Sequence, residues 1–251
     1  MIFSSYICMK AIILAAGGNL RLRDYIDIPK CLLPLGKSTL LENQISSLIK
    51  ASIKKEDILV VVGYKQELIK KLHGHTLFNP KFKEFDNGYS VYLALKYLLY
   101  EEHLGNDEKI LILDGDLVYD GDLIHKINNL NKENVLVNKP VKYSTELKDE
   151  ISITDKNGKI TKLFIPSKQN PLSYEYSKIP LYSFTGIMKI SKKVAEQLYK
   201  KLETSHQKWY TVPFPELVSV NDFHSFEVPK NLKYFFDVDT KEDMEKLSNI
   251  K

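Results

Sequence analysis

The first 115 residues alternate between short apolar runs and longer amphipathic runs, and this alternation limits the possible fold more than any other feature. The run at 57–63 is almost wholly apolar, as expected for a strand in a sheet covered on both faces. Thr39-Leu-Leu-Glu42 has the form of a capping box and predicts a helix start. We expect strands at 10–16, 57–63, 75–78 and 109–113, with helices from Thr39, at 65–72 and at 87–104. This order predicts right-handed crossovers and a Rossmann-like, mostly parallel mixed sheet flanked by helices.

The pattern changes beyond residue 135. Asp155-Lys-Asn-Gly158 between two strand-like runs predicts a β-hairpin with Asn-Gly in its turn. The stretch 166–180 is polar and contains prolines, so we expect an exposed excursion. Further strands are expected at 183–190, 223–228 and 234–239, and helices at 191–202 and 240–247. We therefore expect one domain, 1–251, with halves at about 9–135 and about 136–251, the second carrying a small hairpin or lid.

The composition excludes several classes of protein. Apolar residues make up 43% and charged residues 27% of the chain, which is ordinary for a soluble globular protein. The net charge of +4 suits a small anionic ligand, but it lacks the concentrated basic face of a nucleic-acid-binding protein. No apolar run is long enough for a membrane span. Cys8 and Cys31 have no metal-ligand spacing, and a single pair is no disulfide framework, so we expect a reducing cytoplasm. Residues 1–8 are expected to form an extension before the first strand.

The first predicted strand leads directly into a loop of small residues followed by cations. Backbone N–H groups in such a loop can face a phosphate chain, while Arg21, Arg23 and Lys30 supply positive charge. A purely structural turn explains the glycines but not these cations, so the pattern favours a nucleoside triphosphate as ligand. The three-glycine dinucleotide fingerprint is absent. The loop and the strand end before it comprise Leu14, Ala15, Ala16, Gly17, Gly18 and Asn19.

Two acidic pairs follow predicted strands. Asp114 and Asp116 end one apolar run, and Asp237 and Asp239 share a face because strand side chains alternate. Mg²⁺ binds few carboxylates and keeps its remaining sites for water and phosphate oxygens. Ligand crevices of such sheets lie at the carboxyl ends of the strands, so we expect both pairs beside the glycine loop. A solvated turn is the alternative for the first pair, and an exposed helix acid is the expectation for Asp243.

Other candidates are less specific. Asn87 and Ser90 open a predicted helix; Ser90 is either its N-cap, or both side chains face a nucleotide base or ribose. Aromatic residues of the second half could hold a cationic ligand by cation–π attraction, or could simply pack in the core. The candidates for this second-ligand pocket are Lys168, Tyr182, Trp209, Tyr210, Glu216 and Asp237, with Tyr174 and Tyr176 beside them.

These residues resemble the nucleotidyltransferase superfamily (sugar nucleotidyltransferase and MobA-like), whose signature reads Leu-Ala-Ala-Gly-x-Gly-x-Arg and then Pro-Lys. The chain is most similar to the compact phosphocholine cytidylyltransferases and their phosphonate- and phosphoamide-activating relatives. Asn19 stands at the position of the signature's second glycine. Because asparagine tolerates left-handed backbone better than most residues, we expect the loop to keep its conformation. The matching segments are Leu14–Gly17, Arg21, Pro29-Lys30, Gly63-Tyr64, Asn79-Pro80, Asn87–Ser90, Asp114–Asp116, Thr185–Ile187 and Asp237–Thr240.

The resemblance implies a role for each matching position. Lys30 and Arg21 would be catalytic and, with residues 14–19, would hold the triphosphate. Asn87 and Ser90 would lie near the base or ribose. Asp116 and Asp239 would bind Mg²⁺. Asp114 would belong to the nucleotide-binding residues, and Asp114 and Asp237 would be secondary to the metal pair. The first half would bind the nucleotide, and the second half would bind the acceptor.

The implied reaction is Mg²⁺-dependent transfer of a cytidylyl group from CTP to a small phosphorylated or phosphonate acceptor, with release of pyrophosphate. Phosphocholine, aminoethylphosphonate and phosphoglutamine are all compatible acceptors, as precursors of a cell-surface polysaccharide or a phospholipid. The expected partners include neither nucleic acid nor membrane, and the protein would be a monomer or a homodimer.

Three alternatives stay open. A sugar-1-phosphate nucleotidyltransferase using UTP or GTP would need the same loop. A metal-dependent glycosyltransferase would share the Asp-x-Asp pair but would not need Lys30 and would release no pyrophosphate. A nucleotide-sensing subunit would bind CTP without turnover.

Overall fold

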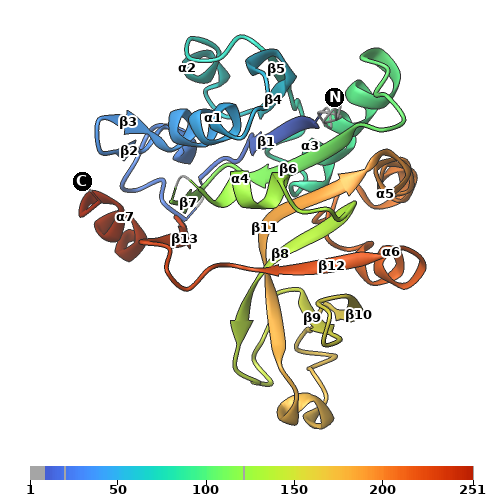
Figure 1. Cartoon of the computed structure of the whole chain (residues 1–251). Coiled ribbons are helices and arrows are strands. Elements are labelled where there is room, and N and C mark those ends of the chain that lie inside the picture. The colour runs from blue at the N-terminus through green and yellow to red at the C-terminus, as the bar shows by residue number, and fades with distance from the viewer. Residues whose placement is uncertain (1–8, 20, 121, 251) are drawn as a thin grey trace, which may run out of the picture.

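The structure, a computed structural model, describes residues 9–19, 21–120 and 122–250 (Figure 1). The expected extension at 1–8, with Cys8, lies outside the described residues. Nine of the described strands form one mixed sheet in the order β10-β9-β11-β6-β1-β4-β5, with β8 pairing with β11 and β12. Helices flank this sheet, so the predicted α/β class is confirmed. None of the described helices is both long and apolar enough to cross a membrane.

The strands and helices have the following bounds. The strands are β1 (Met9–Ala15), β2 (Pro34–Leu35), β3 (Ser38–Thr39), β4 (Ile58–Val62), β5 (Thr76–Phe78), β6 (Lys109–Asp114), β7 (Leu117–Tyr119), β8 (Asn134–Val141), β9 (Ile151–Thr154), β10 (Ile160–Phe164), β11 (Leu181–Ser191), β12 (Phe223–Glu227) and β13 (Phe235–Asp237). The helices are α1 (Leu40–Lys50), α2 (Gln66–Lys70), α3 (Gly88–Lys96), α4 (Leu123–Asn128), α5 (Lys192–Ser205), α6 (Phe214–Val220) and α7 (Lys241–Ser248).

The first half contains a four-stranded parallel unit. β1 pairs with β4 and β6, and β4 pairs with β5, all in parallel. The register places Leu14 opposite Asp114, so the glycine loop and the first acidic pair leave the sheet side by side. The Gly115 N–H donates to the Leu14 carbonyl at 3.0 Å, and a Cβ on Gly115 would lie 2.6 Å from that oxygen. Only glycine allows this approach of the two strand ends.

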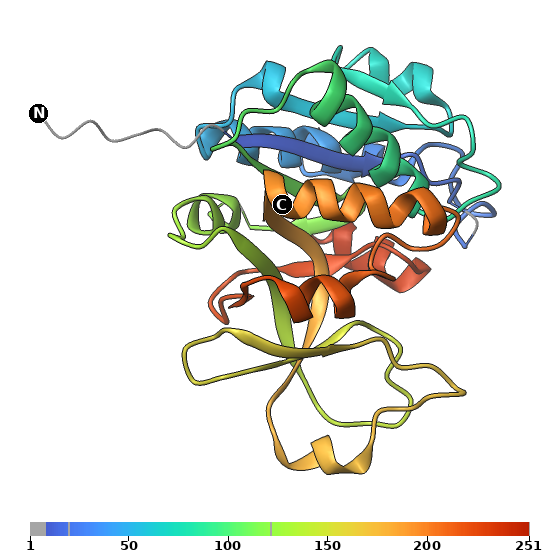
Figure 2. The ribbon, with the colours of Figure 1, turned by 90° about the vertical axis from the view of Figure 1, so that its right-hand side faces the viewer.

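The second half joins the same sheet through antiparallel strands. β11 pairs with β6, β8 and β9, and its register shifts between Phe184 and Met188, around Gly186 at φ +82°. The predicted hairpin is present as β9 and β10, with Gly158 at φ +78° in its turn. This hairpin and residues 166–180 extend away from the α/β body in Figure 2. α4, β8 and α6 were not predicted from the sequence.

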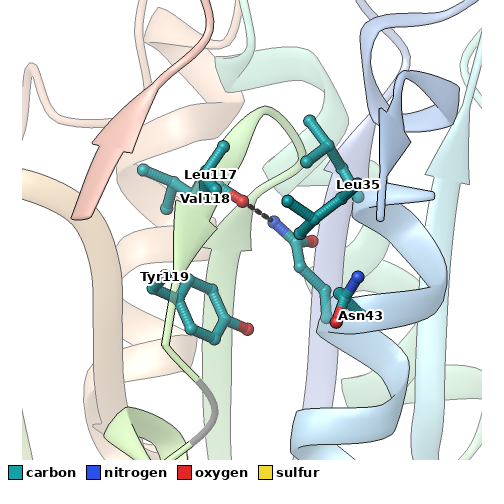
Figure 3. Close-up of a pocket in the computed structure, with 7 residues that line it drawn as sticks. Leu35, Asn43, Leu117, Val118 and Tyr119 are labelled. Atoms are coloured by element: carbon teal, nitrogen blue, oxygen red, sulfur yellow. Dashed lines mark hydrogen bonds between the residues drawn. The ribbon is translucent and has the colours of Figure 1, made fainter. Parts of the chain in front are cut away.

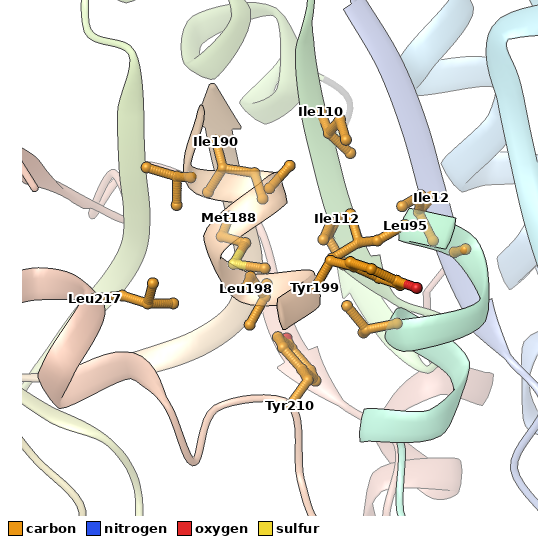
Figure 4. Packing of buried hydrophobic residues seen from close by; sticks show 14 of the residues in the cluster. Ile12, Leu95, Ile110, Ile112, Met188, Ile190, Leu198, Tyr199, Tyr210 and Leu217 are labelled. Atoms are coloured by element: carbon orange, nitrogen blue, oxygen red, sulfur yellow. The ribbon is translucent and has the colours of Figure 1, made fainter. Parts of the chain in front are cut away.

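Alternation along the strands builds one core on each face of the sheet. Ile12 points into a cluster with α3 and α5, while Ile13 points into a cluster with α1 and α4. Figure 4 shows the first cluster, in which Tyr210 reaches in beside Met188 and Leu198. The sheet is therefore covered on both sides, and its carboxyl edge presents the site residues.

Helix starts follow the predicted caps in α1 but not in α3. Thr39 and Glu42 form the predicted capping box of α1. α3 begins at Gly88, so the reading of Ser90 as its N-cap is wrong. The Ser90 hydroxyl instead accepts a hydrogen bond from Asn79 at 2.9 Å. The predicted helix at 87–104 ends as an α-helix at Lys96 and continues as one π-helical turn, Tyr97–Glu101.

Candidate active site

Lys30 is the centre of the site because its ammonium joins both predicted metal ligands. Its Nζ lies 3.2 Å from Asp116 Oδ2 and 2.5 Å from Asp239 Oδ1. The Arg21 guanidinium contacts the other oxygen of Asp239 at 2.8 Å. Three segments that are far apart in the sequence therefore meet, as the strand-end rule predicts.

A two-stranded ladder brings Asp239 to this place. β13 pairs antiparallel with β7, with Asp237 opposite Leu117. The next amide, Val238 N–H, donates to the Asp116 carbonyl at 3.1 Å. Asp239 thus follows a strand that is anchored to the residue after Asp116. The Asp237 side chain is exposed at the end of β13.

Gln44 of α1 fixes the turn that carries the first acidic pair. Its Nε2 donates to the Asp114 carbonyl at 3.0 Å and to the Leu117 carbonyl at 3.1 Å, and the residue is buried. Figure 3 shows the small pocket where α1 meets β7, with the bond to Leu117 dashed. The sequence analysis did not identify Gln44, because it lies among the apolar residues of an ordinary amphipathic helix.

Replacing Gln44 with leucine should destabilise the protein and weaken its activity together. The change removes both hydrogen bonds that Gln44 donates, one of them fully buried, and losing a partner of a buried polar group costs about 1–3 kcal/mol. It also frees the turn that holds Asp116. Thermal melting and nucleotide binding measure the two effects, with Ser46→Leu, at an exposed position of the same helix, as control. Unchanged melting and binding in Gln44→Leu would contradict this role.

Asn19 replaces the signature glycine and holds the loop closed. Its backbone is left-handed, at φ +54°, as expected for a residue that tolerates this region. Its Nδ2 donates to the Ile28 carbonyl at 2.5 Å, and its Oδ1 accepts from the Lys30 N–H at 3.3 Å. The loop survives as predicted, and Asn19 acts as a link to Lys30 that glycine could not provide.

The other loop residues divide into structural and open positions. The carbonyls of Leu14 and Ala16 accept from Gly115 and Tyr64, and Ala15 is buried. Gly17 is exposed, and a Cβ on it would meet nothing within 4 Å. Gly18 accepts from Arg23 through its carbonyl. Turn residues, rather than a helix N-terminus, follow this loop, so any anion there would face loop amides and cations.

The charges around Lys30 strongly affect one another. Burial opposes the charged form of Lys30, but Asp116 and Asp239 outweigh it and raise the pKa, so the ammonium persists at neutral pH. Burial and the adjacent Asp116 raise the pKa of Asp114 well above its usual range. Burial also raises the pKa of Asp116, and Lys30 opposes that effect. The site therefore gathers more carboxylates than its cations neutralise, which favours an added cation.

The structure gives Asn87 and Ser90 internal partners. Ser90 is buried and bonded to Asn79, as described above. The Asn87 Oδ1 accepts from the Tyr210 N–H at 3.2 Å. Both side chains thus have structural roles whatever else they contact.

The expected aromatic pocket does not assemble as one cage. Tyr174 packs edge-on against Tyr143, and Tyr176 packs against Phe164 on the hairpin. Tyr210 instead packs against Phe184 and Phe214, 5.7 Å between ring centroids for Phe214. The 3₁₀ turn Tyr174–Lys178 lies within the stretch 166–180 and contains no buried residue, whereas Tyr210 is 1% exposed. For Tyr210 the contacts agree with core packing, the alternative considered for these aromatic residues.

The remaining acceptor candidates lie in different environments. Glu216 is 69% exposed and forms an ion pair with Lys201 on the outer surface of α6. Lys168 is exposed in the excursion, and Trp209 is 55% exposed. Tyr182 is half-buried on β11 opposite Ser152. No contact described for these residues joins them to the carboxylate cluster, which comprises Asp114, Asp116 and Asp239. Tyr210, in contrast, lies close to Asp114 and Asp116 of this cluster.

Tyr210 lies near Glu150, a buried acid that was not predicted from the sequence to belong to the site. Its hydroxyl is buried and has no hydrogen-bond partner among the described residues. Burial, with the nearby charges of Asp114 and Glu150, raises its pKa well above the usual range. Glu150 is itself buried and accepts a hydrogen bond from the Thr211 hydroxyl. Nothing in the sequence distinguishes Glu150 from the charged residues that precede it.

The Glu150→Gln variant should become more stable than the wild type as the pH rises. Burial raises the folded-state pKa of Glu150 above its usual 4.5, so the folded state binds the proton more tightly than the unfolded state. Stability from this group is therefore complete below pH 4.5 and is lost as the pH rises through the raised pKa. Glutamine keeps the oxygen that faces Thr211. Chemical denaturation of both proteins across pH 4 to 8 measures the difference, and a difference independent of pH would contradict this account.

The acidic residues fit a hard cation that needs few protein ligands. The described residues contain no group of three or more His, Cys, Asp or Glu arranged to hold a metal. Asp116 and Asp239 nevertheless share one ammonium, so a single small cation can contact both. Mg²⁺ is often held by one or two carboxylates plus substrate phosphates. The predicted pair is thus compatible with Mg²⁺ when a triphosphate supplies further oxygens.

Comparisons with known proteins agree with this arrangement. The model of the MobA-like NTP transferase domain family matches residues 11–152. Choline-phosphate cytidylyltransferase of Streptococcus pneumoniae (strain ATCC BAA-255 / R6) is 41% identical over 95 residues, which cover 36% of this chain and 41% of the relative. The sequence alignment therefore spans less than half of that relative's length.

Two solved structures share the fold over nearly the whole chain. The CTP:phosphocholine cytidylyltransferase of Streptococcus pneumoniae has a TM-score of 0.75 at 23% identity, covering 97% of this chain and 99% of that one. UDP-glucose pyrophosphorylase complexed with UDP-glucose has a TM-score of 0.71 at 13% identity, covering 96% and 97%. The family match includes the glycine loop, Lys30 and both residues of the first acidic pair. Because it spans more than half of the chain, the protein belongs to the MobA-like NTP transferase domain family.

Proposed function

We propose that this protein is a nucleotidyltransferase that moves a cytidylyl group from CTP to a small phosphorylated or phosphonate acceptor and releases pyrophosphate. The observation that carries the proposal is the contact of one lysine, Lys30, with two strand-end carboxylates beside an open glycine loop. Such a site can hold a triphosphate and its cation together. Residues of about 9–135 would bind the nucleotide, and those of about 136–251 would bind the acceptor.

The reaction needs charge neutralisation more than proton transfer. An acceptor oxygen attacks the α-phosphorus in line; the new P–O bond forms as the bond to the β-phosphate breaks, and pyrophosphate leaves. The attacking phosphate oxygen is already anionic near neutral pH, so no general base is required. Lys30 and Arg21 would stabilise the charge on the phosphates, since cations placed in advance act most strongly where water is excluded. Bound Mg²⁺, held by Asp116 and Asp239, would neutralise phosphate charge.

CTP is the favoured nucleotide because of the sequence similarity to choline-phosphate cytidylyltransferase. The likeness in fold to UDP-glucose pyrophosphorylase keeps a sugar-1-phosphate nucleotidyltransferase as the second candidate. A glycosyltransferase is less consistent with the site, because its chemistry would not need Lys30.

Pyrophosphate release tests the proposal directly. Purified protein is assayed with CTP, UTP, GTP and ATP, each with phosphocholine, aminoethylphosphonate, phosphoglutamine or glucose 1-phosphate, with Mg²⁺ or with EDTA. We expect release only with Mg²⁺, and fastest with CTP and a phosphorylated amine or amide or a phosphonate. Fastest release with UTP or GTP and the sugar phosphate would support the second candidate. Mg²⁺-dependent CTP binding without release on any acceptor would support a nucleotide sensor and overturn the proposal.

A further inference from the structure

The connection between α5 and α6, residues 206–213, is bonded to the start of α3. Three hydrogen bonds join the two segments. Asp86 N–H donates to the Gln207 carbonyl at 3.1 Å, and Gly88 N–H donates to the Lys208 carbonyl at 3.0 Å. The Tyr210 N–H donates to the Asn87 side chain at 3.2 Å. Two of these bonds join backbone to backbone, and Asn87 supplies the one side chain.

Close packing reinforces this junction. A Cβ on Gly88 would lie 2.1 Å from the Lys208 carbonyl oxygen, so only glycine permits the approach. The His206 ring stacks on Tyr92, with centroids 5.1 Å apart and planes at 30°, and lies 5.2 Å from the Tyr89 ring. The first half of the chain therefore holds this connection both by hydrogen bonds and by aromatic contacts.

The connection carries two residues, Tyr210 and Thr211, that lie near acidic side chains from both halves of the chain. Tyr210 follows the junction directly and is 1% exposed, and its hydroxyl, near the charges of Asp114 and Glu150, has no hydrogen-bond partner in the part of the chain that the structure describes. Thr211 donates its hydroxyl to Glu150. The Asn87 side chain accepts a hydrogen bond from the Tyr210 backbone. It therefore helps to fix the position of the backbone that carries the Tyr210 and Thr211 side chains.

We propose that Asn87 is a positioning residue for the acceptor side of the site. Its Oδ1 fixes the Tyr210 backbone, and through it the Tyr210 and Thr211 side chains beside Asp114 and Glu150. This inference rests on the proposed function for its kinetic consequence, but its structural part is independent of any activity. It differs from the expectation by resemblance that Asn87 faces the base or ribose, because its carboxamide oxygen already accepts a bond from the other half of the chain.

Two substitutions separate these roles. Asn87→Ala removes the acceptor oxygen, while Asn87→Asp keeps an oxygen there and adds a negative charge favoured at the start of a helix. Asn129→Ala, at an exposed position near the end of α4, is the matched control. Asn87→Gln, which moves the carboxamide by one methylene, replaces Asn87→Ala should that variant fail to fold by circular dichroism.

Trp209 gives a direct structural readout, because it is the only tryptophan of the chain and precedes Tyr210. We expect Asn87→Ala to raise the acrylamide quenching of Trp209 fluorescence and Asn87→Asp to restore it. In steady-state assays, the acceptor KM should rise about five- to tenfold, the effect of losing one neutral hydrogen bond, with CTP KM changed less than twofold. Asn129→Ala should match the wild type in every measurement.

The outcomes distinguish this inference from the proposed function. Unchanged Trp209 quenching in Asn87→Ala, or a rise in CTP KM without a rise in acceptor KM, would overturn the positioning role. If the wild-type protein turns over no acceptor, the proposed function fails, and the quenching comparison alone still decides whether Asn87 positions this connection.

Discussion

Replacing Lys30 with methionine should lower turnover by about three orders of magnitude while leaving the protein folded. Methionine keeps the length and apolar stem of lysine but removes the ammonium that lies between Asp116 and Asp239. The lost charge would otherwise stabilise the phosphates of the transition state. Pyrophosphate release measures the effect, and Lys156→Met, at an exposed position in the hairpin turn, is the control. A folded Lys30→Met protein with normal turnover would show that Lys30 has no catalytic part.

The same substitution should strengthen the binding of a divalent cation in the absence of nucleotide. In the structure the Lys30 ammonium lies beside both carboxylates, where a metal ion would be repelled by it. Without that charge, the two carboxylates are free to accept the ion. Titration with Mn²⁺ followed by electron paramagnetic resonance measures this affinity without reference to activity. Weaker Mn²⁺ binding in Lys30→Met than in the wild type would contradict the idea that the Lys30 ammonium and the metal ion compete for the same two carboxylates.

Replacing Asp239 with asparagine should have the second large effect, a loss of about two orders of magnitude or more in turnover. Asp239 is the only described residue that contacts both Lys30 and Arg21, so its loss disturbs the metal pair and both cations at once. We expect CTP affinity in Mg²⁺ to fall to the value measured in EDTA. Asp222→Asn, which removes a surface partner of Lys159, is the matched control. CTP affinity that still responds to Mg²⁺ in Asp239→Asn would exclude Asp239 as a required ligand.

The sheet and the carboxylate cluster could be predicted because both depend on short-range patterns. Apolar runs of strand length fix which residues end each strand, and parallel pairing then brings those ends to one edge. That rule brought the first acidic pair beside the glycine loop, where Asp116 also contacts Lys30 across 86 residues of sequence. The second acidic pair, Asp237 and Asp239, lies at the end of β13, and pairing of β13 with β7 brings it beside the first pair.

The acceptor side could not be predicted in the same way. Tyr210 and Glu150 meet because β11 changes partners at Gly186 and because the α5–α6 connection folds back onto Gly88. Neither event leaves a periodic pattern in the sequence. Residue type allowed the aromatic residues either to hold a cation or to pack in the core, but it could not say which neighbours each ring would have. Gln44 was missed for the related reason that one polar residue in an amphipathic helix does not indicate its partners.

Calorimetric titration of the wild-type protein and of Asp116→Asn with CTP, each in Mg²⁺ and in EDTA, measures whether the strand-end carboxylates contribute to binding of a metal-bound triphosphate. If strand-end carboxylates and Lys30 together hold a metal-bound triphosphate, the wild type binds CTP at least tenfold more tightly with Mg²⁺, and Asp116→Asn loses that gain. Equal CTP affinity with and without Mg²⁺ in the wild type, or a full Mg²⁺ effect in Asp116→Asn, would contradict it.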